Sequence, residues 1–231
     1  MNQGLRFGLA ALISLAAVWA GAEMYLSRFA PPAEHGVPVP AGEASEATAQ
    51  DLGDDAAMAN PPTVKIPQQL PDFKLADLDG RMTSVSQWRG KSLMINFWAT
   101  WCAPCRREIP LLQALHAEHA GHDTLVVGVA VDYPDKVREF RERFKIAYPL
   151  LVGEQDALDL AAALGVASPA FPFTVFTDRR GEIVTLYLGE LKRPAADTIL
   201  AVVDDLNEDR ITLPAARARI ATALSREQSK S

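Results

Sequence analysis

The chemistry that this chain could perform is concentrated in one pentapeptide, Trp101-Cys102-Ala103-Pro104-Cys105, which holds its only two cysteines. Two cysteines at this spacing either cycle between a dithiol and a disulfide or supply half of a metal site. The apolar run Leu93 to Trp98 precedes them, and a segment with helical spacing follows from Arg106. The sequence therefore predicts a strand, a tight turn and a helix whose N-terminus carries Cys102. There the helix dipole and unpaired N–H groups lower a thiol pKa, and Pro104 suits the first helical turn.

Other interpretations of the cysteine pair are less favourable. A static disulfide across so short a loop would constrain the unfolded chain little. A zinc site would need His116 and His119, but His116 lies roughly 11 residues after Cys105, about 16 Å along a helix axis. We therefore expect no metal, and no cofactor beyond the redox-active Cys102–Cys105 disulfide. A module that binds Cu(I) through the two thiolates, as a metallochaperone does, stays an alternative.

The composition favours one globular domain with appendages. The chain has 231 residues, of which 48% are hydrophobic, and its formal net charge is −6. A nucleic-acid partner is disfavoured, because such partners require a basic surface.

The N-terminal segment predicts export. An uncharged run extends from Phe7 to Ala22, and continuing it to Leu26 gives about 20 residues, enough to cross a bilayer. We expect residues 1–28 to be a membrane anchor; the alternative is a signal segment cleaved after Ala20-Gly21-Ala22, which would leave a soluble periplasmic protein. Residues 29–65 are rich in Pro, Ala and acidic residues and predict a disordered tether. The domain that follows is thus expected in the periplasm, held at the inner membrane.

Residues 66–208 predict a domain that alternates strands and helices. The expected strands are 73–76 and 82–85, joined by a turn with an Asp-Gly pair, then 93–98, 125–131, 173–176 and 183–188; the expected helices run from the redox turn to about residue 119 and over 135–145, 156–164 and 194–207. This order implies an α/β fold with a parallel pair around the redox turn and a final antiparallel hairpin. Residues 209–231 predict a helical extension, either packed on the domain or loose.

The stretch Asn96 to Cys105, followed by Glu108 and Pro110, resembles the thioredoxin superfamily, and specifically its TlpA/ResA-like branch of membrane-anchored thiol–disulfide oxidoreductases. The resemblance implies a thioredoxin-like fold with an N-terminal β-hairpin, an inserted helix and a central mixed sheet flanked by helices. It implies a reductase of protein disulfides in cytochrome c biogenesis or copper-site assembly. The implied partners are a disulfide-containing protein substrate and a transmembrane electron donor of the DsbD/CcdA type.

The resemblance also assigns a role to Glu108. Thioredoxins carry a buried Asp in the strand before the cysteines, where this chain has Asn96, which cannot titrate. Glu108 matches an acidic residue of the TlpA/ResA-like branch and shares a helix face with Cys105, with which a buried carboxyl of raised pKa would exchange a proton. The alternative is a first-turn Glu that suits the helix dipole.

A substrate groove is implied by the same resemblance. Pro172 matches the cis-proline of the superfamily, where it would lie across from Cys102 and keep metal away from the cysteines, and substrate backbone would pair with Phe171. Pro169 is a weaker candidate for that proline. Trp101 and Pro104 complete the expected groove, with Trp101 as an exposed contact.

Two further activities stay as alternatives. Ala-Pro between the cysteines does not fix the redox direction, so the enzyme could also act as a thiol oxidase or a disulfide isomerase. A peroxiredoxin-like peroxidase is less favoured, because a CxxC pair would be unusual there.

Overall fold

The computed structural model describes residues 66–121, 123–166 and 170–229. The expected anchor (1–28) and tether (29–65) lie outside the described residues, as does Pro169. Among the described residues, no helix combines the length and apolar character that crossing a bilayer requires.

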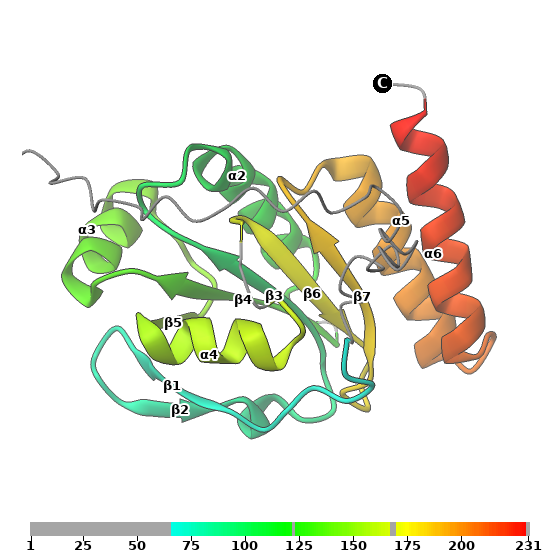
Figure 1. Cartoon of the computed structure of the whole chain (residues 1–231), viewed down its shortest axis with the longest axis horizontal. Coiled ribbons are helices and arrows are strands. Elements are labelled where there is room, and N and C mark those ends of the chain that lie inside the picture. The colour runs from blue at the N-terminus through cyan, green and yellow to red at the C-terminus, as the bar shows by residue number, and fades with distance from the viewer. Residues whose placement is uncertain (1–65, 122, 167–169, 230–231) are drawn as a thin grey trace, which may run out of the picture. The chain divides into compact units, whose positions relative to one another are not determined.

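A mixed sheet of seven strands, in the order β2-β1-β5-β4-β3-β6-β7, forms the centre of the described fold (Figure 1). Strands β3, β4 and β5 are parallel, and the other pairs are antiparallel. The strands are β1 Lys74–Asp77, β2 Met82–Ser84, β3 Ser92–Trp98, β4 Thr124–Val131, β5 Leu150–Gly153, β6 Phe173–Thr177 and β7 Ile183–Leu188.

Helices cover both faces of this sheet. They are η1 Val85–Trp88, α2 Ala103–Glu118, α3 Pro134–Phe144, α4 Gln155–Ala163, α5 Arg193–Asn207 and α6 Leu213–Gln228. Side chains of α2, α3, α5 and α6 share one hydrophobic cluster, and those of α4 belong to a second. Figure 1 shows α4 alone in front of the sheet, with α2 and α3 behind it.

The pleat of β3 explains this two-sided arrangement. Met94 and Trp98 point into the cluster of α2 and α3, whereas Leu93, Ile95 and Phe97 point into the cluster of α4. Successive side chains of a strand alternate between faces, and every residue of β3 is buried. A strand buried on both faces is rigid, so its C-terminal end is a firm support for the turn that carries the cysteines.

The expected elements are present, with end shifts of a few residues, and one strand was missed. The inserted element expected as a helix also contains β5, which pairs in parallel with β4 and antiparallel with β1. The four residues of β5 are too few to show the hydrophobic periodicity that would distinguish a strand from a loop in the sequence.

The C-terminal extension forms α6, which packs on the domain. Its side chains Leu213, Ala216 and Ile220 are buried in the same cluster as α5. Arg217 donates to the carbonyl oxygen of Ile183 at the start of β7 at 2.6 Å. The α6 helix therefore covers core that would otherwise face solvent.

Candidate active site at the redox turn

The two cysteines form a disulfide at the start of α2, with an S–S distance of 2.01 Å. Cys102 caps the helix, and its sulfur accepts a hydrogen bond from the backbone N–H of Cys105 at 3.2 Å. Cys102 is 5% exposed and Cys105 is fully buried. When the bond is reduced, the same N–H and the helix dipole would stabilise a Cys102 thiolate. The more accessible sulfur is therefore also the one best placed to be the nucleophile.

The turn before the cysteines is fixed from both sides. The N–H of Cys102 donates to the carbonyl oxygen of Ala99 at 3.2 Å. Thr100 donates through its backbone N–H (3.0 Å) and its hydroxyl (2.5 Å) to the carboxylate of Asp132, which follows β4. Pro104 lies in the first turn of α2, where its missing N–H leaves no bond unmade.

Glu108 is buried beneath this turn, with only 1% of its surface exposed. Its two oxygens accept hydrogen bonds from Asn96 Nδ2 and from the backbone N–H of Leu191, each at 2.8 Å. Loss of hydration on burial raises the pKa of Glu108 to about 7, although these hydrogen bonds act in the opposite direction. Because α2 begins at Ala103, Glu108 lies beyond the first turn, so a helix-dipole role does not describe its position.

Sequence reasoning missed the other groups around this carboxyl. Asn96 gives its second amide hydrogen to Thr174 Oγ1 at 3.0 Å. Tyr148 is also buried, and burial together with the charge of Glu108 raises its pKa. Thr174, a polar residue between Phe173 and Val175 in β6, was the one available signal in the sequence, whereas Leu191 acts through its backbone N–H, which its residue type does not reveal.

Two of the expected groove residues, Trp101 and Phe171, contact each other beside the redox turn, and Pro172 is buried. The Phe171–Pro172 peptide bond is cis, as the resemblance implies. Pairing of Phe97 with Phe173 brings this bond to the end of the sheet where β3 leads into the cysteines. The rings of Trp101 and Phe171 meet edge to face at 6.1 Å, and Trp101 is 67% exposed. An exposed aromatic surface thus borders Cys102.

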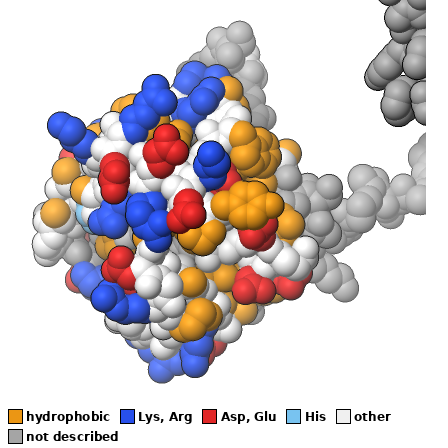
Figure 2. Space-filling view, turned by 90° about the vertical axis from the view of Figure 1, so that its left-hand side faces the viewer, with side chains coloured by type: hydrophobic (Ala, Val, Ile, Leu, Met, Phe, Trp, Pro, Cys, Tyr) orange, Lys and Arg blue, Asp and Glu red, His pale blue; other side chains and the backbone are white. Residues whose placement is uncertain are grey.

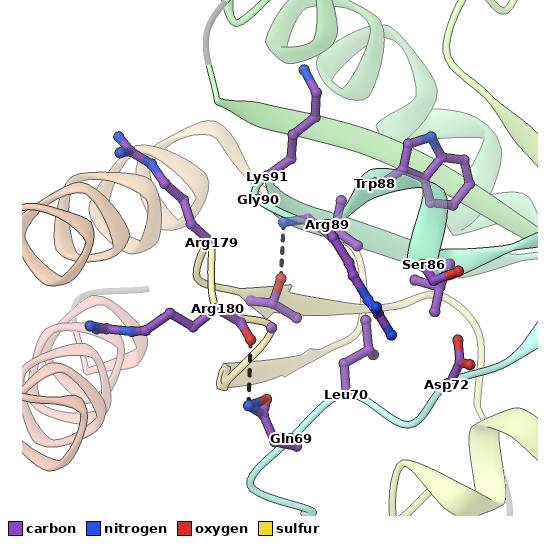
Figure 3. A pocket seen from close by; sticks show the side chains of 14 residues that line it. Gln69, Leu70, Asp72, Ser86, Trp88, Arg89, Gly90, Lys91, Arg179 and Arg180 are labelled. Atoms are coloured by element: carbon purple, nitrogen blue, oxygen red, sulfur yellow. Dashed lines mark hydrogen bonds between the residues drawn. The ribbon is translucent and has the colours of Figure 1, made fainter.

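A separate cavity of about 420 Å³ lies at the opposite end of β3 (Figure 3). Lys91 lines it and immediately precedes β3, whereas the cysteines follow the strand. Figure 3 shows Arg179 and Arg180 pointing away from Arg89, and both pair with carboxylates, at 3.1 Å to Asp123 and 3.0 Å to Asp178. This cavity therefore takes no part in the chemistry of the disulfide.

A mixed sheet, a cis-proline just before β6 and a CxxC pair at a helix N-terminus together define the class of thioredoxin-like thiol–disulfide oxidoreductases. The family description AhpC/TSA family matches residues 66–187, more than half of the chain. The chain belongs to this thioredoxin-like family.

Curated relatives and a solved structure agree with this class. The chain is 32% identical to thiol–disulfide oxidoreductase ResA of Geobacillus thermodenitrificans over 131 residues, 56% of this chain and 73% of the relative. It is 36% identical to thioredoxin-like protein YneN of Bacillus subtilis over 132 residues, 54% of this chain and 73% of the relative. A thiol:disulfide interchange protein from Chlorobium tepidum TLS superposes with a TM-score of 0.54 at 25% identity, covering 59% of this chain and 96% of the other. The enzyme is accordingly a protein thiol–disulfide oxidoreductase.

Proposed function

We propose that the enzyme reduces protein disulfides outside the cytoplasm while held at the membrane by its N-terminal segment. Its substrates would be apocytochrome c or copper-site assembly proteins, and a transmembrane dithiol protein of the DsbD/CcdA type would regenerate it. The observation that carries the proposal is Glu108, a buried carboxyl with a pKa of about 7 on the helix face of Cys105.

The proposed cycle starts from the dithiol. The Cys102 thiolate attacks one sulfur of the substrate disulfide, forms a mixed disulfide and releases the other substrate sulfur as a thiolate. Cys105 then loses its proton to the Glu108 carboxylate and attacks Cys102, which releases the second substrate thiolate. Two electrons pass from the enzyme to the substrate, and the enzyme is left in the disulfide form described here.

The charge of Glu108 favours this reducing direction. A carboxylate near Cys105 disfavours a second negative charge, so it raises the thiol pKa of Cys105. Destabilised thiolates make the reduced form less stable relative to the disulfide, which lowers the reduction potential. With Asn96 in the strand, Glu108 is the buried carboxyl on the helix of Cys105, whereas the buried carboxyl of Asp132 accepts hydrogen bonds from Thr100.

The test is reduction of insulin disulfides by the pre-reduced enzyme, compared with its Cys102→Ser and Glu108→Gln variants. We expect Cys102→Ser to be inactive, and Glu108→Gln to turn over more slowly with a lower Cys105 pKa in a thiol titration. Equal insulin reduction by Cys102→Ser and wild type would reject the mechanism, and an unchanged Cys105 titration in Glu108→Gln would reject the role of the carboxyl.

A Cu(I)-binding role is tested separately by titrating the reduced protein with Cu(I). Stoichiometric uptake would favour the metallochaperone alternative, and sub-stoichiometric uptake would reject it.

A further inference from the structure

A groove of about 470 Å³ lies beside the redox turn, between the start of α2 and α3. Thr100 and Arg106, which lie within two residues of the cysteines, form one wall, and residues of α3 form the other. Phe140 and Phe144 stack at 4.2 Å on the α3 side. The groove is therefore continuous in sequence and space with the site of disulfide exchange.

Three cations line this groove, and none of them has an acidic partner in the described part of the chain. Arg106, Lys136 and Arg143 are exposed, and their charged groups lie within ion-pair distance of no described carboxylate. Arg143 contacts the ring of Phe144 with its guanidinium, 5.4 Å from the ring centroid. Glu139 is the acidic residue among those that line the groove, so the lining carries an excess of positive charge.

This positive excess contrasts with the negative net charge of the whole chain. The whole chain has a formal net charge of −6, and most exposed arginines elsewhere in the described fold pair with Asp or Glu, as Arg107 does with Glu190 and Arg193 with Glu118. Figure 2, which views the molecule from the side of α3, shows Lys and Arg mixed with acidic and hydrophobic side chains. A group of three cations without carboxylate partners in the described part of the chain therefore lies next to the reactive sulfur.

We propose that this groove binds acidic side chains of the protein whose disulfide is reduced, so that preferred substrates carry Asp or Glu near their disulfide. The proposal rests on the proposed function and specifies its substrate class. Trp101 and Phe171 would contact the apolar part of the substrate on the other side of Cys102, while the groove orients its acidic part. Complementary charges of this kind raise association rates and select partners, and salt screens them.

The experiment uses two synthetic peptides with one internal disulfide each, identical except that Glu residues flank the disulfide in one and Gln residues in the other. The Lys136→Glu/Arg143→Glu variant reverses two groove charges and leaves Arg106, next to Cys105, in place, so that the thiol chemistry is not disturbed. The Arg89→Glu/Lys91→Glu variant is the matched control, because it changes the net charge equally at the far end of β3.

We expect kcat/KM of the wild type to be about tenfold higher for the Glu peptide at low salt, because several exposed ion pairs together reach that magnitude. The preference should fall at high salt and vanish in the groove variant, but persist in the control variant. Equal rates for the two peptides, or an equal loss of preference in both variants, would overturn the proposal. Oxidised glutathione is a small anionic disulfide. If the wild type prefers it to both peptides and does not prefer the Glu peptide to the Gln peptide, the groove binds small anionic disulfides and the proposal is overturned.

Failure of the proposed function gives a different result. Hydroxyethyl disulfide is uncharged, so the groove should not affect its reduction by either variant. If the wild type reduces neither hydroxyethyl disulfide nor either peptide, the proposed reductase function is rejected. If it reduces hydroxyethyl disulfide normally but does not prefer the Glu peptide, only the proposed role of the groove is rejected.

Discussion

The buried carboxyl of Glu108 should make the folded protein less stable as the pH rises through neutrality. Burial raises its pKa from 4.5 to about 7, so between these values the folded state holds a proton that the unfolded state has lost. The free energy of unfolding therefore falls with increasing pH in this window. A shift of this size corresponds to about 3 kcal/mol of stability, which is fully present below about pH 4 and lost by about pH 8.

The Glu108→Gln substitution removes this titration. The glutamine oxygen still accepts from Asn96, but its amide faces the N–H of Leu191, which costs about 1–3 kcal/mol at every pH. The diagnostic quantity is therefore the difference in unfolding free energy between variant and wild type as a function of pH. That difference should shift by about 3 kcal/mol in favour of the variant between pH 4 and 8.

Urea unfolding of the oxidised proteins at a series of pH values measures this difference. Glu118→Gln, an exposed position on the same helix whose pKa Arg193 lowers, is the control and should show no shift between pH 5 and 8. Burial lowers the pKa of His116, and because all three proteins keep this side chain, we expect its contribution to cancel in the difference. If the unfolding free energies of the wild type and Glu108→Gln differ by a constant amount from pH 4 to 8, the Glu108 carboxyl does not have the buried environment described here.

Three other substitutions test neighbouring features. Asn96→Asp places a second carboxyl against Glu108, so we expect the pair to retain a proton above pH 7 in a carbon NMR titration, and two carboxyls that are both ionised at pH 7 would contradict the packing. Trp101→Ala should leave the unfolding free energy within about 0.5 kcal/mol but reduce kcat/KM for insulin more than for hydroxyethyl disulfide; equal reductions would argue against a substrate contact. Gly128→Ala should lower the free energy of unfolding in urea by about 1–3 kcal/mol, because the new methyl group would lie 2.6 Å from Leu150 Cδ2. An unchanged free energy of unfolding would show that the neighbouring side chains move to make room for the methyl group.

The redox turn was predictable from sequence because its determinants are local. The apolar run of β3, the two cysteines and Pro104 are neighbours in the chain, and each acts through its own backbone conformation or position in the helix. The paired strands β6 and β7 were also predictable, since an apolar run stands on either side of a turn containing Gly181.

The environment of Glu108 was only partly predictable, because its partners come from distant segments. Leu191 lies 83 positions after Glu108 in the sequence and donates through its backbone N–H, so its residue type does not predict this contact. Thr174 reaches Asn96 across 78 positions through the pairing of β3 with β6. The groove cations lie on two helices, and their lack of acidic partners is visible only after folding.

The most direct test of the proposed direction of electron flow is the reduction potential of the Cys102–Cys105 pair, measured by equilibration with glutathione or dithiothreitol redox buffers. A buried carboxyl that disfavours the Cys105 thiolate predicts a potential near that of thioredoxin, about −270 mV. A value near about −120 mV, typical of a strong thiol oxidant, would contradict the reductase function.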